Sequence, residues 1–187
     1  MAIIATRRLV AARIDPIIRG RIMTITSQLS ATTRVRIKRL NPSIPLPRYE
    51  TEGSAAFDLA AAAELTVDPG TVALVPTGLV IEVPHGMFLG IFARSSTPLK
   101  RGLMVANGVG VVDQDYCGPN DEVKIAVLNF TAAPVRIAAG DRLAQGMLLP
   151  VNRVSWEEVD VVRKESRGGF GSTGSRIADP GSRHHSE

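Results

Sequence analysis

An octapeptide near the C-terminus, Arg167-Gly168-Gly169-Phe170-Gly171-Ser172-Thr173-Gly174, combines residue types that can bind a nucleotide. Glycines let backbone N–H groups approach phosphate oxygens, and a guanidinium such as that of Arg167 can bind those oxygens with two parallel hydrogen bonds. The ring of Phe170 offers a flat face for a base. A flexible Gly/Ser-rich tail has a similar composition, so this segment needs support from others.

A second informative stretch runs from Asn107 to Tyr116 with the sequence Asn-Gly-Val-Gly-Val-Val-Asp-Gln-Asp-Tyr. Asn-Gly is typical of a hairpin turn with positive φ, and glycines at its tip can expose backbone groups to the edge of a planar base. Asp113 follows two valines, at the point where a strand would leave the core. Asp113 and Asp115 can equally be ordinary turn carboxylates.

Three further segments add polar groups. Arg94 precedes Ser95 and Ser96, a cation and two hydroxyls that suit phosphate oxygens; an N-cap beside a surface arginine is the alternative. The turn 140–146 leads into a strand carrying Gln145, which can donate to an anion. Asp58 stands among apolar neighbours, either near a metal ion or as a hydrogen-bonded structural carboxylate. None of these three segments is decisive alone.

The positive charge of the chain is concentrated near its start. The whole sequence has 22 Lys/Arg and 18 Asp/Glu, a net charge of +4. Residues 1–40 hold nine of these cations against one acid, Asp15, for a net charge of +8, which leaves −4 for the remainder. The high pI is therefore weak evidence for nucleic-acid binding, and no nucleic-acid partner is expected for the body of the protein.

Residues 1–33 form a basic N-terminal extension that we expect to be disordered. The segment resembles an organellar transit peptide in being rich in arginine and poor in acids, although an upstream start codon, with Met23 as the alternative initiator, is the simpler explanation. No apolar run approaches the roughly 20 residues that span a bilayer. The single cysteine, Cys117, suits a reducing compartment, so we predict a cytoplasmic protein without membrane contact.

Alternating apolar residues predict an all-β domain over residues 34–160. Such runs occur at 35–37, 79–83, 88–92, 123–127 and 135–137, with Gly- or Pro-containing turns between them. Many short strands joined by tight turns favour a sandwich, jelly roll or barrel. Only Ser95–Arg101 is expected to be helical. Residues 161–187 are predicted to form a flexible C-terminal arm that carries the Gly-rich motif 167–174.

Taken in order, segments 56–60, 93–98, 107–118, 140–146 and 167–174 resemble the five motifs of the trimeric deoxyuridine triphosphate nucleotidohydrolases (dUTPases). No P-loop, GxSxG or HExxH motif competes with this interpretation. The resemblance implies a distorted jelly-roll (β-clip-like) subunit with very little helix. It further implies a homotrimer whose active sites are shared between subunits, dUTP as substrate and Mg²⁺ as cofactor.

The resemblance also implies roles for particular residues. Asp113 matches the aspartate that positions and activates the attacking water, and Arg94 matches a phosphate contact that is also assigned to catalysis. Asp58 matches a carboxylate that acts through the water shell of a magnesium ion or supports the site. Tyr116 matches a ring that packs under the deoxyribose and excludes a 2′-hydroxyl. The remaining residues implied in substrate binding are Ser95, Ser96, Asn107, Gly110, Gln145, Arg167, Phe170, Gly171, Ser172 and Thr173.

The sequence departs from the common pattern directly after Tyr116. Cys117 stands where the family often has Arg or Gln, and residues 118–122 form a connection about three residues longer than usual. A dCTP deaminase is the nearest rival, but its glutamate-bearing third motif is not visible. A catalytically silent trimer and a nucleic-acid accessory protein with a basic arm are the alternatives from other classes. The retained Asp113, Tyr116 and Arg167 favour the enzyme.

Overall fold

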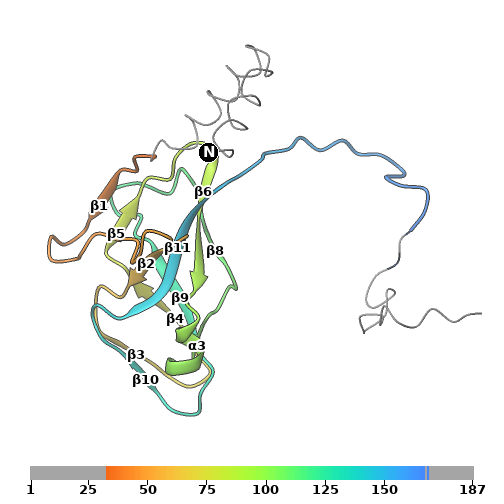
Figure 1. The fold of residues 1–187 in the computed structure, drawn as a ribbon. Coiled ribbons are helices and arrows are strands. Elements are labelled where there is room, and N and C mark those ends of the chain that lie inside the picture. Colours follow the sequence, from red (N-terminus) through yellow and green to blue (C-terminus); the bar gives the residue numbers. More distant parts are fainter. Residues whose placement is uncertain (1–32, 167, 169–187) are drawn as a thin grey trace, which may run out of the picture. The chain divides into compact units, whose positions relative to one another are not determined.

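The computed structural model describes residues 33–166 and Gly168, and Figure 1 shows the arrangement of the strands within the body. Short strands dominate it, with one helix of six residues, α3. The elements in chain order are β1 (Ile37–Arg39), β2 (Phe57–Ala60), β3 (Leu65–Val67), β4 (Val72–Pro76), β5 (Leu79–Ile81), β6 (Met87–Ala93), α3 (Ser96–Arg101), β7 (Leu103–Val105), β8 (Gly110–Val112), β9 (Lys124–Asn129), β10 (Val135–Ile137) and β11 (Arg142–Pro150).

Four small antiparallel sheets make up the body. The largest has the order β2-β11-β6-β8, and a three-stranded sheet has the order β4-β9-β7. Two strand pairs, β1-β5 and β10-β3, complete the set. In Figure 1, β11 crosses the body between β2 and β6, and this strand carries the polar residues considered below. The all-β prediction with very little helix is confirmed.

A single aliphatic core explains why these strands form. Inward-facing residues of successive strands are fully buried, among them Leu59, Leu89, Ile125 and Leu143. The burial pattern of β9 alternates between exposed or half-buried and buried positions from Lys124 to Asn129, as a strand with one face in the core requires. Small aliphatic side chains fill the interior, as expected for a chain with only 4% aromatic residues.

The predicted strands agree with the structure except at their ends and at one hairpin. Val35 precedes β1 and Val83 follows β5. The Asn107-Gly108 turn joins β7 to β8, and Gly108 has a φ of 70° as that dipeptide predicts. The two strands do not pair with each other, however, because β7 pairs with β9 while β8 pairs with β6. The turn therefore connects two sheets.

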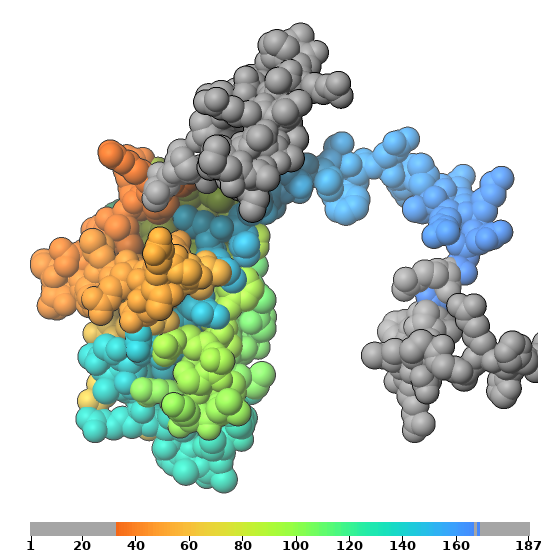
Figure 2. Space-filling model, in the orientation of Figure 1, coloured from red at the N-terminus to blue at the C-terminus, as the bar shows by residue number. Residues whose placement is uncertain are grey.

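The folded body ends at Asn152, and residues from Arg153 onward form a separate unit. Residues 153–166 contain no helix or strand and are exposed. Within the body, Figure 2 shows the orange segment that follows β1 spread over the surface. No helix among the described residues has the length and apolar character to cross a membrane. The division into segments 1–33, 34–160 and 161–187 stays a prediction.

Candidate active site

Asp58, Arg94 and Gln145 lie side by side at one end of the largest sheet. The register of β11 places Gln145 opposite Asp58 of β2 on one side and opposite Phe92 of β6 on the other. Arg94 directly follows β6 and reaches across β11. Its Nε donates to Oδ1 of Asp58 at 2.8 Å, and its Nη1 donates to the carbonyl oxygen of Arg142 at 3.2 Å. Three sequence-predicted residues are thus brought together.

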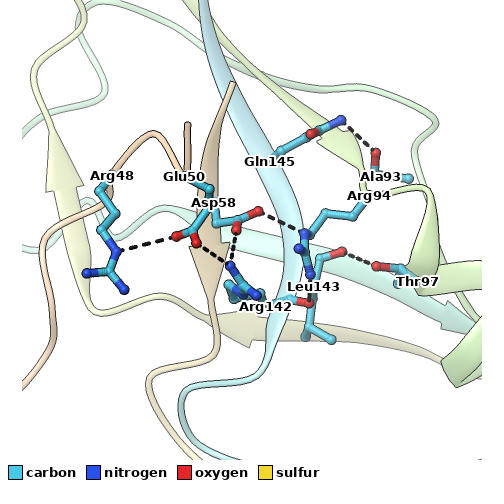
Figure 3. Close-up of polar contacts among 9 residues, drawn as sticks. All are labelled: Arg48, Glu50, Asp58, Ala93, Arg94, Thr97, Arg142, Leu143 and Gln145. Carbon is cyan, nitrogen blue, oxygen red and sulfur yellow. Dashed lines mark hydrogen bonds and ion pairs between the residues drawn. The ribbon is translucent and has the colours of Figure 1, made fainter. Parts of the chain in front are cut away.

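The carboxylate of Asp58 is held between two guanidinium groups, as Figure 3 shows. Arg142 donates from Nη1 to Oδ2 of Asp58 at 2.9 Å and also lies 3.0 Å from Glu50, which pairs in turn with Arg48. The Asp58 side chain is only 14% exposed. Three cations and two carboxylates leave this cluster with one net positive charge, which suits an anionic ligand.

Sequence reasoning missed Arg142 and Glu50 as members of this cluster. Arg142 lies within the segment 140–146 that the sequence singled out, but only Gln145 of that segment was assigned a contact. The available signal was an arginine at the start of a strand that must pair with the strand of Asp58. Glu50 precedes β2 in an irregular segment, and no local pattern marks it.

Side chains from residues 94–101, which include helix α3, bond to the three consecutive residues 141–143 at the start of β11. The buried hydroxyl of Thr97 donates to the carbonyl oxygen of Leu143 at 2.7 Å, and Arg94 bonds the carbonyl oxygen of Arg142. Arg101 binds both carboxylate oxygens of Asp141, at 2.6 and 2.7 Å. These contacts fix the turn that carries the predicted phosphate-binding hydroxyls.

The two predicted hydroxyls occupy that turn. Ser95 is exposed and is the N-cap residue of α3, but its side chain makes no capping hydrogen bond, and Ser96 is half-buried. Gln145 donates from Nε2 to the carbonyl oxygen of Ala93 at 3.1 Å, so its amide lies beside the same turn. The arrangement leaves the hydroxyl of Ser95 exposed next to the positive cluster.

The Arg101–Asp141 pair perturbs the acidity of both groups. Two hydrogen bonds from Arg101 lower the pKa of Asp141 below its usual value of 3.8, with a smaller contribution from the N–H of Ala138. The same carboxylate raises the pKa of Arg101. A lowered carboxyl pKa means that the folded protein stabilises the charged form of Asp141. The pair therefore stays ionised at neutral pH.

Asn107 and Gly110 flank the turn between β7 and β8. Asn107 is exposed, and the N–H groups of Gly108 and Val109 are already bonded to the carbonyl oxygens of Val105 and Asn107. The expectation of free backbone N–H groups does not hold at these two positions. Gly110 is buried in β8, where a Cβ atom would lie 3.0 Å from Cβ of Ile91. Close packing of β8 on β6 is therefore one reason for a glycine there.

Asp113 lies at the other end of β6 from Arg94, and Tyr116 follows it by three residues. Val112 of β8 pairs with Leu89, so the position of Asp113 follows beside Phe88, whereas Arg94 comes just after the opposite end of β6. A strand advances about 3.3 Å per residue, which separates the two Cα positions by about 20 Å along β6. Both side chains are exposed, and Tyr116 is 43% accessible. Within one chain the structure does not bring Asp113 and Arg94 together.

Residues 33–166 contain no cluster of side chains that could by itself bind a metal ion. Within residues 33–166 there is no group of three or more His, Cys, Asp or Glu side chains placed to hold a metal ion. Asp58 has both oxygens bonded to guanidinium groups, but each oxygen keeps a further lone pair that can accept a hydrogen bond from water. The remaining predicted site residues, Arg167, Phe170, Gly171, Ser172 and Thr173, lie outside the described part.

Comparison with known proteins decides the family. The dUTPase family model matches residues 42–174, which is most of the chain. The chain belongs to the dUTPase family. It is 42% identical over 155 residues to the deoxyuridine 5′-triphosphate nucleotidohydrolase of Thermobifida fusca, covering 81% of this chain and 85% of that protein. The protein of the same name from Desulfitobacterium hafniense is 43% identical over 150 residues, covering 78% of this chain and 97% of that protein.

A solved dUTPase confirms the fold. The crystal structure of the Streptococcus mutans dUTPase matches with a TM-score of 0.60 and 33% sequence identity, covering 65% of this chain and 98% of that chain. The jelly-roll subunit predicted from the five motifs is the fold that these dUTPases share. The resemblance drawn from the motifs is thereby confirmed, while the roles of individual residues stay predictions.

Proposed function

We propose that this protein hydrolyses dUTP to dUMP and pyrophosphate, which limits uracil in DNA and supplies dUMP for thymidylate synthesis. Family membership supports the reaction, because relatives that cover most of this chain are named for it. The observation that carries the proposal is the juxtaposition of Asp58, Arg94 and Gln145 beside an exposed Ser95. With Arg142, Arg48 and Glu50 the cluster has one net positive charge, which suits a triphosphate. The cytoplasmic location stays a prediction.

In the proposed reaction, water attacks the α-phosphorus. Phosphoryl transfer depends mainly on positioning and on neutralising the charge of the phosphate oxygens. Arg94, fixed by Asp58, and Gln145 would hold those oxygens together with Ser95 and Ser96. Asp113 is exposed, and no other side chain of the described part hydrogen-bonds to it, so it is free to accept a proton from the attacking water.

The proposed magnesium ion would arrive with the triphosphate. Mg²⁺ prefers oxygen ligands, keeps several waters and is commonly bound through substrate phosphates and one or two carboxylates. Asp58 fits a bond to a metal-bound water better than direct ligation, since both its oxygens already face guanidinium groups. The ion would neutralise phosphate charge. Loss of turnover on chelation, restored by added Mg²⁺, is the expected outcome.

We further propose that the active site is shared between subunits of a homotrimer. Arg94 and Asp113 lie about 20 Å apart along β6, too far to act on one phosphorus from the same chain. If one end of a subunit meets the other end of the next, a head-to-tail contact results, and such contacts close into rings. Family resemblance sets the number of subunits at three.

Exposed apolar surface supports this assembly. On the outer face of the β4-β9-β7 sheet, Val72 is 59%, Leu74 61% and Met104 43% accessible. In the separate unit after Asn152, Trp156 is 92% exposed. Exposed apolar residues gathered on one sheet face commonly mark protein contacts, and further copies of the chain would bury them. In the proposed trimer, Arg167 and Phe170 of another subunit would close the site.

The substrate is tested by measuring pyrophosphate release from dUTP, dTTP, dCTP and UTP with the full chain. We expect turnover of dUTP alone at a substantial rate. Ammonia release from dCTP would instead identify a deaminase. If no nucleotide is hydrolysed while one is bound, the protein would be a catalytically silent binder and the proposal would be wrong.

Sharing of the site is tested by mixing two inactive variants, R94A and D113N, by joint refolding. Each site of a cyclic trimer would take Arg94 from one chain and Asp113 from the next. Random mixing then gives about a quarter of the sites both intact residues, and about a quarter of wild-type activity. Native mass spectrometry verifies that mixed trimers form. Mixed trimers without activity would show that sites are not shared in this way.

A further inference from the structure

Glu122 connects Tyr116 to the body of the fold through two hydrogen bonds. The phenol of Tyr116 donates to the carbonyl oxygen of Glu122 at 3.3 Å. The side chain of Glu122, only 16% exposed, accepts the backbone N–H of Gly78 through Oε1 at 2.7 Å. Glu122 closes the longer connection 118–122, so the unusual loop and the Tyr116 ring share one attachment.

The backbone of Gly78, to which Glu122 bonds, is closely packed and hydrogen-bonded. It has a φ of +67°, which disfavours other residues, and an added Cβ would come within 1.9 Å of Cδ1 of Ile44. Its carbonyl oxygen accepts the N–H of Leu40 at 2.8 Å. The neighbouring Leu79 accepts the N–H of Val123 at 2.8 Å through its carbonyl oxygen, so the chain is also held at the residue that follows Glu122.

The loop itself is braced by its own polar groups. Asp121 accepts the N–H of Gly118 through Oδ2 at 2.7 Å, and Lys38 of β1 donates to the carbonyl oxygen of Pro119 at 2.9 Å. These bonds shape residues 118–121 but do not contact Tyr116. Among the described residues, Glu122 alone hydrogen-bonds both to the phenol of Tyr116 and to Gly78.

We propose that Glu122 is a positioning residue that sets the discrimination between deoxyribose and ribose. The inference rests on the proposed function, in which the Tyr116 ring packs under the sugar and excludes a 2′-hydroxyl. A ring can exclude one oxygen atom only if it is held to a fraction of an ångström. Anchoring the Glu122 backbone through its own carboxylate supplies that restraint to the phenol.

The test compares kcat/KM for dUTP and for UTP in three full-length variants. E122A removes the acceptor for Gly78, and we expect the dUTP-to-UTP ratio to fall about tenfold, the effect of one lost hydrogen bond to a charged group. E122Q keeps an oxygen acceptor and should retain the wild-type ratio. E82Q is the matched control, because Glu82 pairs with Arg36 on the neighbouring β1-β5 side and does not contact Tyr116.

A second comparison separates positioning from general loosening. Y116F removes the phenol oxygen and should lower the ratio by a similar factor, and E122A combined with Y116F should add little, because both changes break one path. An unchanged ratio in E122A, or equal loss of kcat/KM for both substrates, would overturn the inference. A wild-type chain that does not hydrolyse dUTP would instead refute the proposed function, a distinct result.

Discussion

Asp58 on β2 and Arg94 after β6 form an ion pair across β11, with Oδ1 of Asp58 2.8 Å from Nε of Arg94. Neither strand pairs directly with the other, because β11 lies between them. The pair therefore depends on two registers at once, those of β11 with β2 and with β6. The ion pair holds the guanidinium of Arg94 at the end of the sheet. Two of its five N–H groups bond to the protein, so the others can donate to a ligand.

Replacing Asp58 should misplace that guanidinium. We expect D58N to lower kcat/KM for dUTP by about 10- to 100-fold, because Arg94 and Arg142 lose a charged acceptor and bind phosphates in altered positions. Steady-state kinetics measures the effect. E50Q is the matched control, since Glu50 is 43% exposed and contacts Arg142 and Arg48 but not Arg94. An equal loss in both variants would contradict the special role of Asp58.

Replacing Asp113 should affect turnover more than binding. D113N removes the proposed proton acceptor while keeping the shape of an exposed side chain, so we expect kcat to fall about 10²-fold or more. Titration calorimetry with a non-hydrolysable dUTP analogue should show nearly wild-type affinity. D115N, altered two residues further on, serves as the control. Unchanged turnover in D113N would reject the assignment.

Removing residues 167–187 should nearly abolish activity without unfolding the body. The last strand of the body ends at Pro150, and the folded unit ends at Asn152, so the deletion removes no described strand. In the proposed mechanism the Gly-rich motif excludes water from the bound nucleotide. Turnover and size-exclusion chromatography of the shortened chain give the answer. Full activity of a folded trimer lacking this segment would refute the proposed closure.

The Arg101–Asp141 pair should make a pH-dependent contribution to stability. Because the pKa of Asp141 is lowered in the folded protein, the contribution is fully present above its usual value of 3.8. It is lost as the pH falls through the lower folded-state value. With Arg101 34% exposed, water screens the pair, and we expect D141N to cost about 1 kcal/mol at neutral pH.

Denaturant unfolding of wild type and D141N at several pH values measures this contribution. The difference in unfolding free energy should be constant near neutral pH and shrink below about pH 4. E64Q is the control, because Glu64 also pairs with an arginine, Arg136, but at a more exposed position. A difference that stays unchanged in acid would mean that Asp141 acts through packing or the Ala138 bond rather than through its charge.

Several features of the fold could be predicted because they depend on local sequence. Alternating residues such as Val123, Ile125 and Val127 mark one buried face of β9, since side chains alternate between faces of a strand. The sequence predicts a short helical turn over Ser95–Arg101, and helix α3 occupies Ser96–Arg101. The helix ends at Gly102, whose backbone is in the left-handed conformation. The dipeptide Asn107-Gly108 predicts the turn between β7 and β8. It does not predict that β7 pairs with β9 and β8 with β6, because strand pairing depends on residues distant in the sequence.

The sequence by itself determined the family and the all-β class, because motifs and strand periodicity depend on neighbouring residues, and it supplied the site residues that stay predictions. Only the tertiary structure decided that Arg142 and Glu50 join the Asp58 cluster, and that Asp113 and Arg94 stand at opposite ends of β6. Strand register sets those relations, and register follows from how the whole set of apolar faces packs into one core.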